Sequence, residues 1–198
     1  MEKEKNVPRL GVVLLAAGKS ERFGSNKLLA DYGGKPLVVC ALEAARAVSA
    51  CRTCVVTGCA QIAGIARENG FDVIENPDVH LGQSHSIHLG ISDMCEMDAV
   101  LLMVCDQPRL TGESLVRLAD AFCASGTRIA CLQDETHMGN PAIFAKAYYP
   151  QLLALSGDRG AKAILKGNPD DLLAVSCVYA HELADADTPQ ELESIRLD

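Results

Sequence analysis

The amino-acid sequence predicts a three-layer α/β sandwich with a Rossmann-like, mainly parallel sheet. Short apolar runs of strand length alternate with amphipathic runs of helical length, which is the pattern of a parallel α/β sheet. Hydrophobic residues make up 48% of the 198 residues, as in a globular protein. A chain of this length can bury a sizeable core, so we expect a single domain over residues 1–198.

The first half of the chain supplies three expected strands and two expected helices. The strands are expected at residues 10–15, 53–57 and 71–75, and the helices at 37–48 and 60–69. Pro36 precedes the first helix, and proline favours a helix start because its fixed φ suits the first turn. Gly70 follows the second helix, at the position where a left-handed residue ends many helices.

The second half continues this alternation. Helices are expected from Ser84 to about Cys95, over residues 111–124 and after Thr188, and short helices are expected to end near residues 155 and 165. Extended segments are expected at 99–105, 128–132, 139–144 and 172–179. Ser84, Thr111 and Thr188 stand at helix starts, where a short hydroxyl can accept a hydrogen bond from a free backbone N–H. The run at 99–105 is the most apolar, so we expect it in the middle of the sheet.

Charge and hydropathy exclude several classes of partner. The net charge of −8 argues against a general nucleic-acid surface, because such a protein would repel the phosphates. The polar N-terminus lacks the apolar core of a signal peptide, and the apolar runs are too short to span a bilayer. We therefore expect a cytoplasmic protein that binds neither nucleic acid nor membrane. A phosphate ligand would have to be held by a local group of cations or by metal ions.

The nine cysteines are scattered and odd in number. Cys105, Cys131 and Cys177 lie in apolar strand-like runs, where free cysteine behaves as a small buried hydrophobe. This distribution favours a reducing compartment without a disulfide framework. Cys51 and Cys54 form a C-x-x-C pair, but the sequence offers no evident further ligands for zinc, so we favour core cysteines over metal or redox use.

The stretch after the first strand has the composition of a polyphosphate-binding loop. The strand ends in small residues at 16–18, which let a bulky ligand approach the backbone. Glycines permit φ > 0 in this loop, and successive backbone N–H groups can form an anion-binding nest. Lys19, Arg22 and Lys27 place positive charge beside it. The spacing is neither that of a Walker A loop nor that of the G-x-G-x-x-G dinucleotide fingerprint.

Asp106 follows the most apolar strand and is a candidate metal ligand. Open α/β sheets bind ligands outside the carboxyl ends of their strands, so Asp106 and the cationic loop face the same edge, whatever the strand order. A carboxylate there suits a Mg²⁺ ion that bridges triphosphate oxygens. The alternative is an aspartate that starts a turn before Pro108, but its combination with the cationic loop favours the metal.

Small polar residues also surround the expected helix start at Ser84. Gly82, Ser84 and Ser86 could face a ligand together with free backbone N–H groups, or Ser84 could simply cap the helix. Three histidines lie within residues 80–88, but no carboxylates partner them in the sequence. We therefore favour solvated or packing histidines over a metal site.

The stretch from Leu15 to Lys27 closely resembles the N-terminal signature of nucleotidyltransferases, L-A-A-G-x-S-x-R-x-G-x-x-K. The matching positions are Leu15, Ala16, Ala17, Gly18, Ser20, Arg22, Gly24 and Lys27. Within that superfamily the chain is most similar to the molybdenum cofactor cytidylyltransferases, which have a fold of the nucleotide-diphospho-sugar transferase type. The resemblance implies that this loop binds the nucleoside triphosphate, with Arg22 and Lys27 at the phosphates.

Two central segments resemble further motifs of this family. Residues 82–86 are similar to G-x-S-x-S, which lies near the base and ribose of the nucleotide. Residues 106–108 resemble D-x-P, which makes Asp106 the expected metal ligand.

Three later segments resemble family motifs in the family's order. Gly139 and Asn140 match G-[NH]-P-x-x-F on the acceptor side, although they could equally form a turn that feeds a strand. Asp158 lies in a match to G-D-x-G-A-[RK], which could bind the acceptor phosphate or merely cap a helix. Asp187 lies in a match to D-[IV]-D-T-P-x-D-L, where it could be a second metal ligand or help to cap the last helix.

The resemblance implies transfer of CMP from CTP to the terminal phosphate of molybdopterin, with Mg²⁺ as cofactor and pyrophosphate as product. Ala17 favours cytidine, because related guanylyltransferases tend to read L-A-G-G. The alternatives are use of GTP with the same acceptor, another phosphate acceptor, or a non-catalytic cofactor carrier. Arg22, Lys27 and Asp106 together argue against a carrier, because a carrier would not need residues that bind a triphosphate and a metal ion. A client molybdoenzyme is a further expected partner.

Overall fold

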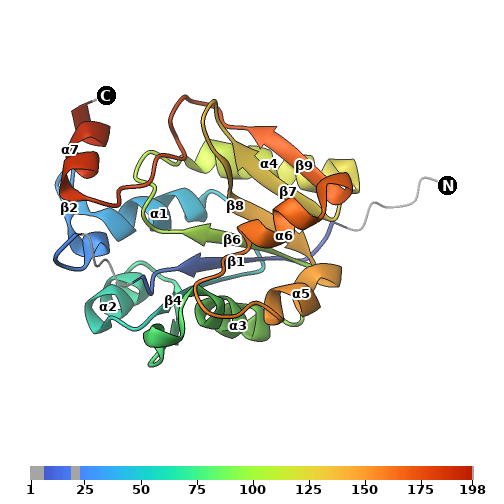
Figure 1. Ribbon diagram of the computed structural model, residues 1–198, viewed down its shortest axis with the longest axis horizontal. Helices are drawn as coiled ribbons and strands as arrows, with labels where there is room; N and C mark the ends of the chain where they lie inside the picture. The colour runs from blue at the N-terminus through green and yellow to red at the C-terminus, as the bar shows by residue number, and fades with distance from the viewer. Residues whose placement is uncertain (1–6, 19–22, 198) are drawn as a thin grey trace.

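The computed structural model describes residues 7–18 and 23–197. Within these residues, a seven-stranded sheet forms the middle layer (Figure 1). Its strands, in spatial order, are β5 (Asp72–Glu75), β4 (Arg52–Thr57), β1 (Leu10–Leu15), β6 (Ala99–Val104), β8 (Met138–Ala145), β7 (Ile129–Gln133) and β9 (Leu172–Ser176). A small separate sheet pairs β2 (Asp31–Tyr32) with β3 (Lys35–Pro36).

Helices pack on both faces of the large sheet. One side carries α1 (Leu37–Arg46), α2 (Ala60–Glu68), α4 (Gly112–Ser125) and α7 (Pro189–Leu197), and the other carries α3 (Gln83–Asp93), α5 (Tyr149–Leu153) and α6 (Lys162–Gly167). Short 3-10 helices run over Lys27–Leu29, Val79–Leu81, Lys146–Tyr148 and Pro169–Asp171. Successive side chains of a strand point to opposite faces. Two hydrophobic cores result: the first lies between the sheet and α1, α2, α4 and α7, and the second lies between the sheet and α3, α5 and α6. Leu14 of β1 packs in the first core, and its neighbour Val13 packs in the second.

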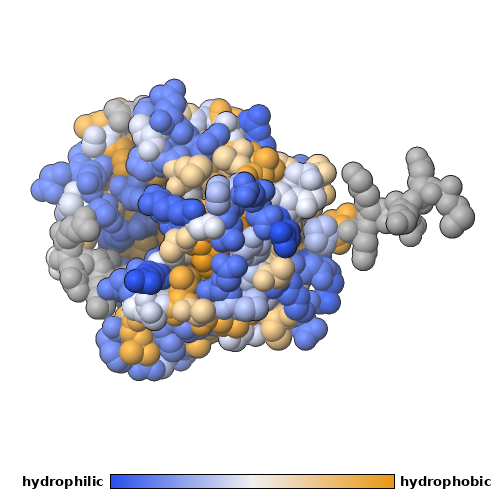
Figure 2. Space-filling view, turned by 45° about the vertical axis from the view of Figure 1, so that its right-hand side comes forward, coloured by the Kyte–Doolittle hydropathy of each residue, from blue (hydrophilic) through white to orange (hydrophobic). Residues whose placement is uncertain are grey.

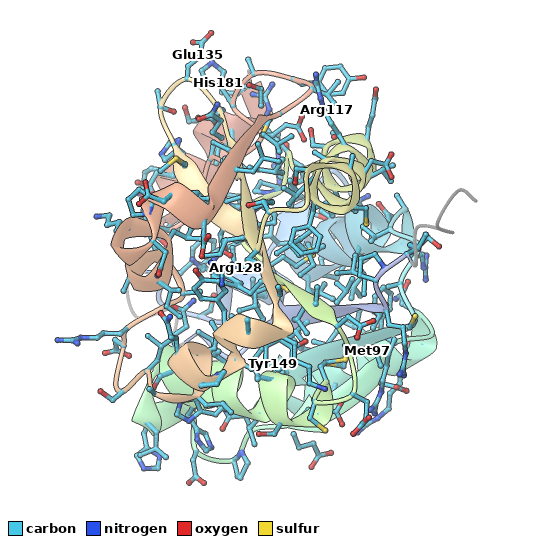
Figure 3. The ribbon with its side chains drawn as sticks, turned by 90° about the vertical axis from the view of Figure 1, so that its right-hand side faces the viewer. Met97, Arg117, Arg128, Glu135, Tyr149 and His181 are labelled. Atoms are coloured by element: carbon cyan, nitrogen blue, oxygen red, sulfur yellow. The ribbon has the colours of Figure 1, made fainter. Side chains whose placement is uncertain are left out.

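The second core extends beyond the sheet to the segment before β6. Tyr149 of α5 is buried, and its hydroxyl donates a hydrogen bond to the carbonyl oxygen of Met97 at 3.3 Å (Figure 3). Burial raises the pKa of the Tyr149 hydroxyl above its ordinary value. This contact fixes α5 to the chain that leads into the central strand.

The sheet reverses its order between β1 and β6. Strands β5, β4, β1 and β6 are parallel, β8 is antiparallel to both of its neighbours, and β9 is parallel to β7. From β1 the chain passes outward to β4 and β5 and then crosses back to β6 on the other side of β1. Open α/β sheets bind ligands at such a switch point. Here Leu15 pairs with Val104, so the segments that follow β1 and β6 leave the sheet side by side.

The structure confirms the predicted fold class and most of the predicted elements. Thr111 caps α4, because its Oγ1 accepts a hydrogen bond from the Ser114 N–H at 3.3 Å. Thr188 caps α7 in the same way, with the Glu191 N–H at 3.2 Å. Gly70, with φ of 80°, ends the turn after α2 in the left-handed region. Local hydrogen bonds of this kind can be predicted because donor and acceptor are neighbours in the sequence.

The prediction that Ser84 caps α3 is wrong. The helix begins at Gln83 after Gly82, whose φ of 88° is a conformation that other residues rarely adopt. Ser84 lies inside the first turn, and its N–H donates to the Gly157 carbonyl oxygen at 3.1 Å. The helix also ends at Asp93, earlier than the expected Cys95.

Other boundaries differ from the expected ones by one to three residues. Helix α1 ends at Arg46 rather than at residue 48. Strand β9 ends at Ser176 rather than at residue 179. The chain leaves the sheet there because the Val178 N–H donates to the Ser114 Oγ at 2.8 Å, at the start of α4.

Cysteines in strand-like runs pack in the core, as expected. Cys54 and Cys131 are fully buried, and burial raises the pKa of these thiols to about 12 and about 11. Cys105 is also buried, and Cys177 is half-buried. Such thiols stay protonated at neutral pH, and a protonated thiol is a poor nucleophile and metal ligand.

Figure 2 shows the polarity of one face of the molecule. On the face shown in Figure 2, hydrophilic residues predominate and hydrophobic residues lie in small groups among them. Among the helices of the described ranges, none combines the length and the hydropathy needed to cross a bilayer.

One buried carboxylate anchors the segment between β9 and α7. Glu182 is 1% exposed and accepts hydrogen bonds at 2.7–2.8 Å from the N–H and hydroxyl of Thr111, the Ser114 hydroxyl and the Tyr179 N–H. Four donors satisfy a buried carboxylate that would otherwise be costly to desolvate. Glu182 thereby fixes the C-terminal segment to the start of α4.

The contact of α3 with β1 requires a glycine at residue 90. A Cβ on Gly90 would lie 2.5 Å from Val13 Cγ1, whereas a Cβ on Gly64 of α2 would meet nothing within 4 Å. We expect Gly90→Ala to lower the free energy of unfolding by about 1–3 kcal/mol through overpacking. Gly64→Ala should raise it by up to about 1 kcal/mol, because alanine favours helix. Urea denaturation measures both, and equal effects would contradict this packing.

Loss of Glu182 should destabilise the protein. In Glu182→Ala the four donors lose their acceptor, and we expect the free energy of unfolding to fall by roughly 2–4 kcal/mol. The control is Glu193→Ala, which removes an exposed carboxylate that pairs with Arg196 at 3.3 Å; this change should cost less than about 1 kcal/mol. Urea denaturation that finds the two variants equally stable would refute the anchoring role.

Candidate active site

The loop after β1 begins with a fixed small-residue turn. The Ala16 N–H donates to the Val56 carbonyl oxygen at 2.9 Å, and the Thr57 hydroxyl donates to the Ala16 carbonyl oxygen at 2.9 Å. Ala16 is therefore buried at 2% exposure and packs below the surface. Ala17 and Gly18 follow it at the surface and line a pocket. Arg22, the expected phosphate ligand, lies outside the described residues.

Lys27 lines the same pocket as Ala17 and Gly18. It begins the first 3-10 helix, which Asn26 caps by accepting a hydrogen bond from the Leu28 N–H at 3.2 Å. Lys27 is 8% exposed, and its Nζ donates to Asp106 Oδ2 at 2.7 Å and to Asp187 Oδ1 at 2.8 Å. Burial acts to lower the pKa of this ammonium, but the two carboxylates outweigh it and raise the pKa above its usual value.

The C-terminal segment brings Asp187 to Asp106. The Ala186 N–H donates to the Asp106 carbonyl oxygen at 2.9 Å, which ties the residue before Asp187 directly to the strand end. The Asp106 side chain is 20% exposed and that of Asp187 is 41% exposed. The sequence left the role of Asp187 open, and the structure places its carboxylate beside Asp106 with Lys27 between them.

A first pocket of about 170 Å³ lies over the end of β1. Its lining residues are Leu15, Ala17, Gly18, Lys27, Leu28, Val79, Gly82, Gln83, Ser86, Val104, Cys105, Asp106 and Asp158. Ser86 is held by the buried Asn76, whose Nδ2 donates to the Ser86 Oγ at 2.9 Å. Among the residues expected to bind the nucleotide, Ala16 and Ser84 are not part of this lining.

Two loops interlock at the wall of this pocket. A Cβ on Gly82 would lie 2.5 Å from the Gly157 backbone and 2.6 Å from Asp158 Oδ1, and a Cβ on Gly160 would lie 2.4 Å from Gln83 Oε1. The loop before α6 therefore packs directly on the start of α3. This contact places Asp158 in the first pocket, whereas its motif suggested the acceptor side.

A second pocket of about 230 Å³ adjoins the first and shares Gln83, Val104 and Asp106 with it. Its other lining residues are Gln107, His137, Met138, Gly139, Asn140, Ala142, Ala161, Lys162, Leu165, Leu183 and Asp185. Gly139 and Asn140 thus lie together with Lys162, and a Cβ on Gly139 would touch the Lys162 side chain at 3.7 Å. Asp106 stands at the boundary of the two pockets.

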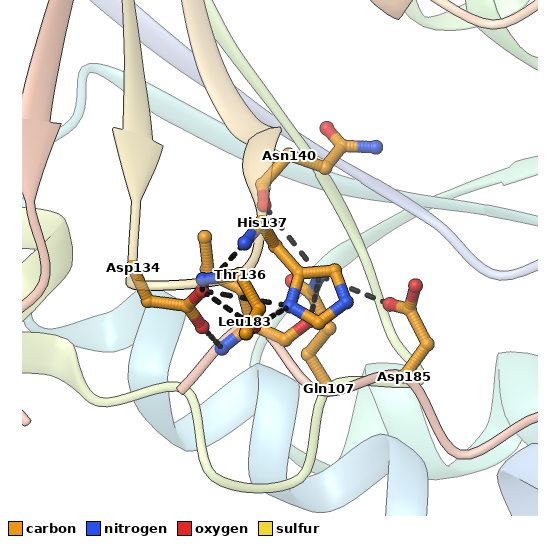
Figure 4. A network of polar contacts seen from close by, with 7 residues as sticks. All are labelled: Gln107, Asp134, Thr136, His137, Asn140, Leu183 and Asp185. Carbon is orange, nitrogen blue, oxygen red and sulfur yellow. Dashed lines mark hydrogen bonds and ion pairs between the residues drawn. The ribbon is translucent and has the colours of Figure 1, made fainter. Parts of the chain in front are cut away.

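A polar network forms one side of the second pocket (Figure 4). Gln107 Nε2 donates to Asp185 Oδ1 at 3.0 Å and to the Leu183 carbonyl oxygen at 3.3 Å. Burial raises the pKa of the Asp185 carboxyl, and the charge of Asp106 raises it further. Asp134 accepts from the N–H groups of Thr136 and His137 at 2.9 and 2.7 Å, which holds the turn above Gln107.

The sequence predictions did not include Gln83, Gln107 or Asp185 among the site residues. Gln107 and Asp185 lie inside the segments that resemble D-x-P and D-[IV]-D-T-P, so the matches to those motifs could have identified both as site residues. Gln83 lines both pockets and packs against Gly160, a contact between distant parts of the chain.

Asp106 and Asp187 suit a divalent metal ion. Asp106 Oδ1 is buried and has no hydrogen-bond partner among the described residues. Within those same ranges, no group of three or more histidine, cysteine or acidic side chains is arranged around a metal position. Mg²⁺ commonly binds to one or two carboxylates together with substrate phosphates rather than to a full protein cage. The pair therefore fits an ion that arrives with a polyphosphate.

Comparisons with known proteins identify relatives of this chain and solved structures with its fold. Purine catabolism protein PucB of Bacillus subtilis (strain 168) is 29% identical over 204 residues, which cover 96% of this chain and 97% of that protein. A probable molybdenum cofactor guanylyltransferase of Pyrococcus horikoshii is 28% identical over 124 residues, which cover 63% of this chain and 62% of that protein. The solved structure of Rv0371c from Mycobacterium tuberculosis H37Rv has the same fold, with a TM-score of 0.79, 23% identity and coverage of 97% and 99%.

A family model establishes the membership. The model of the MobA-like NTP transferase domain matches residues 12–173, which include every lining residue of the first pocket and all those of the second pocket except Leu183 and Asp185. The chain therefore belongs to the MobA-like NTP transferase family, and it is a nucleotidyltransferase.

Proposed function

We propose that this protein transfers CMP from CTP to the terminal phosphate of molybdopterin and releases pyrophosphate. The observation that carries the proposal is the pair of adjoining pockets that share Asp106. The first pocket includes the loop after β1 and supports nucleotide binding there. The second has room for an acceptor next to it, so that the reacting atoms would meet at Asp106.

The first pocket has the groups that a nucleoside triphosphate needs. Ala17 and Gly18 allow the phosphates to approach the backbone, and Lys27 supplies positive charge. Arg22 is expected to act with Lys27 on the departing pyrophosphate. Ala17 supports CTP, because its methyl group narrows the space where related guanylyltransferases tend to have glycine, although one methyl group discriminates only modestly.

The second pocket supports a phosphate-bearing acceptor. Lys162 provides a cation beside Gly139 and Asn140, and Gln107 with Asp185 provides polar groups on the other side. A phosphate monoester could place its anionic end toward Lys162 and Asp106 and its larger part along the network. Molybdopterin is supported as this acceptor by the names of relatives, including the guanylyltransferase of Pyrococcus horikoshii.

The reaction needs positioning and charge neutralisation rather than a covalent intermediate. A phosphate oxygen of the acceptor forms a bond to the α-phosphorus of the nucleotide, and the bond from that phosphorus to the bridging oxygen of pyrophosphate breaks. No general base is required, since a phosphate monoester is already anionic near neutral pH. Asp106 and Asp187 would hold Mg²⁺, which when bound neutralises charge on the phosphate oxygens.

GTP is the second candidate for the nucleotide. The observation that favours it is the name of the Pyrococcus horikoshii relative, a probable molybdenum cofactor guanylyltransferase. Both nucleotides would use the same phosphate and metal positions, so the choice between them depends on the base contacts near Ala17 and Ser86.

Pyrophosphate release tests this proposal. We expect release with molybdopterin and Mg²⁺ to be fastest with CTP among the four nucleoside triphosphates. Asp106→Asn should lower kcat/KM by about 10²–10³-fold, because one preorganised charge at the reacting phosphates is lost. The control is Asp72→Asn, which changes a 63% exposed carboxylate that pairs with Arg52, and its activity should match the wild type. No release with any nucleotide would refute the acceptor, and normal turnover of Asp106→Asn would refute the metal role.

A further inference from the structure

Lys27 occupies the position between the two carboxylates that are expected to bind metal. Its Nζ lies 2.7 Å from Asp106 Oδ2 and 2.8 Å from Asp187 Oδ1, and the residue is 8% exposed. Both are charge-assisted hydrogen bonds at short range in a partly desolvated site, where they are stronger than in water. The ammonium thus supplies positive charge to both carboxylates in the protein alone.

A bound triphosphate would compete with the two carboxylates for this ammonium. Lys27 also lines the first pocket, together with Ala17 and Gly18. A triphosphate in that pocket would place several negative charges near Nζ and compete with Asp106 and Asp187 for it. A divalent cation would compete for the carboxylate oxygens that Nζ now contacts.

We propose that Lys27 acts as an internal cation that keeps divalent metal out of the site until a nucleotide draws the ammonium away. In the free protein, metal binding must break two charge-assisted hydrogen bonds and bring a divalent charge close to an ammonium. When the triphosphate binds, Lys27 moves to its phosphates and the carboxylates become available. This inference rests on the proposed function in one respect, that Asp106 and Asp187 are the metal ligands.

Binding of nucleotide and of metal should therefore be linked through one side chain. Linkage is reciprocal, so the metal must raise nucleotide affinity by the same factor by which the nucleotide raises metal affinity. Chelation of metal by phosphates contributes to this factor in any nucleotide enzyme. The displacement of Lys27 makes an additional contribution to this factor. A substitution of Lys27 removes that contribution.

Mn²⁺ binding to the nucleotide-free protein, measured by electron paramagnetic resonance, tests the inference without turnover. We expect Lys27→Met to bind Mn²⁺ about tenfold more tightly than the wild type, because two hydrogen bonds to a charged group no longer have to be broken. Lys27→Gln serves as a second variant with a polar side chain, and circular dichroism verifies that both variants fold. Lys27→Arg retains the cation and should bind Mn²⁺ as weakly as the wild type.

The matched control is Lys162→Met, which removes a positive charge from the adjoining pocket, where Lys162 lies near Gly139. Its Mn²⁺ affinity should change by less than about twofold, since a solvated charge that makes no contact with the carboxylates is screened. An equal gain in Lys27→Met and Lys162→Met would show a general charge effect and overturn the proposal. Unchanged or weaker Mn²⁺ binding in both Lys27→Met and Lys27→Gln would also overturn it.

A second titration follows the nucleotide effect. A non-hydrolysable CTP analogue should raise Mn²⁺ affinity more in the wild type than in Lys27→Met, and equal gains would contradict the displacement of Lys27. These titrations contain no acceptor and need no catalysis. A failure of pyrophosphate release with molybdopterin would therefore refute the proposed acceptor and leave the result for Lys27 standing, and the two outcomes can be distinguished.

Discussion

The parallel pairing of β1 with β6 is the constraint on which the site depends. Because Leu15 pairs with Val104, the two segments that leave the sheet at its switch point start side by side. One becomes the small-residue turn that contains Ala17, and the other provides Asp106. Neither strand can shift its register by one residue without moving its buried side chains to the other face. The core that packs β1 between its neighbours therefore also fixes the distance between the nucleotide loop and Asp106.

Two further contacts complete the cleft, and both join segments far apart in the sequence. Glu182 fixes the C-terminal segment to the start of α4, which lets Ala186 bond to the backbone of Asp106 and brings Asp187 alongside. Gly82 and Gly157 pack backbone against backbone and close the wall of the first pocket. The charge arrangement follows from these contacts, because Lys27 meets both carboxylates only after the C-terminal segment has docked.

Much of the fold and part of the site could be predicted from the sequence, because those features depend on local patterns. The caps at Thr111 and Thr188 involve residues three positions apart, and the apolar strand that ends at Asp106 is visible as a run. The edge shared by Asp106 and the first loop follows from the rule for parallel sheets. Lys27, Asp106 and the turn at 16–18 were found for these reasons.

The remaining features depend on tertiary contacts that no local pattern encodes. Ser84 looked like a cap, but the loop at Gly157 takes its N–H, and only the positive φ of Gly82 lets the chain turn there. Asp158 lies in the first pocket because that loop packs on α3. The ion pairs of Lys27 with Asp106 and Asp187 join residues 79 and 160 positions apart, so spacing in the sequence gives no indication of them.

We propose that Asp106 and Asp187 hold a metal ion beside a nucleotide whose phosphates bind Lys27. Anomalous diffraction from crystals with Mn²⁺ and a non-hydrolysable CTP analogue tests it most directly. We expect one strong manganese peak within coordination distance of both carboxylates, with the Lys27 ammonium on the phosphates. A peak elsewhere, or Lys27 still bound to Asp106 with the nucleotide present, would contradict it.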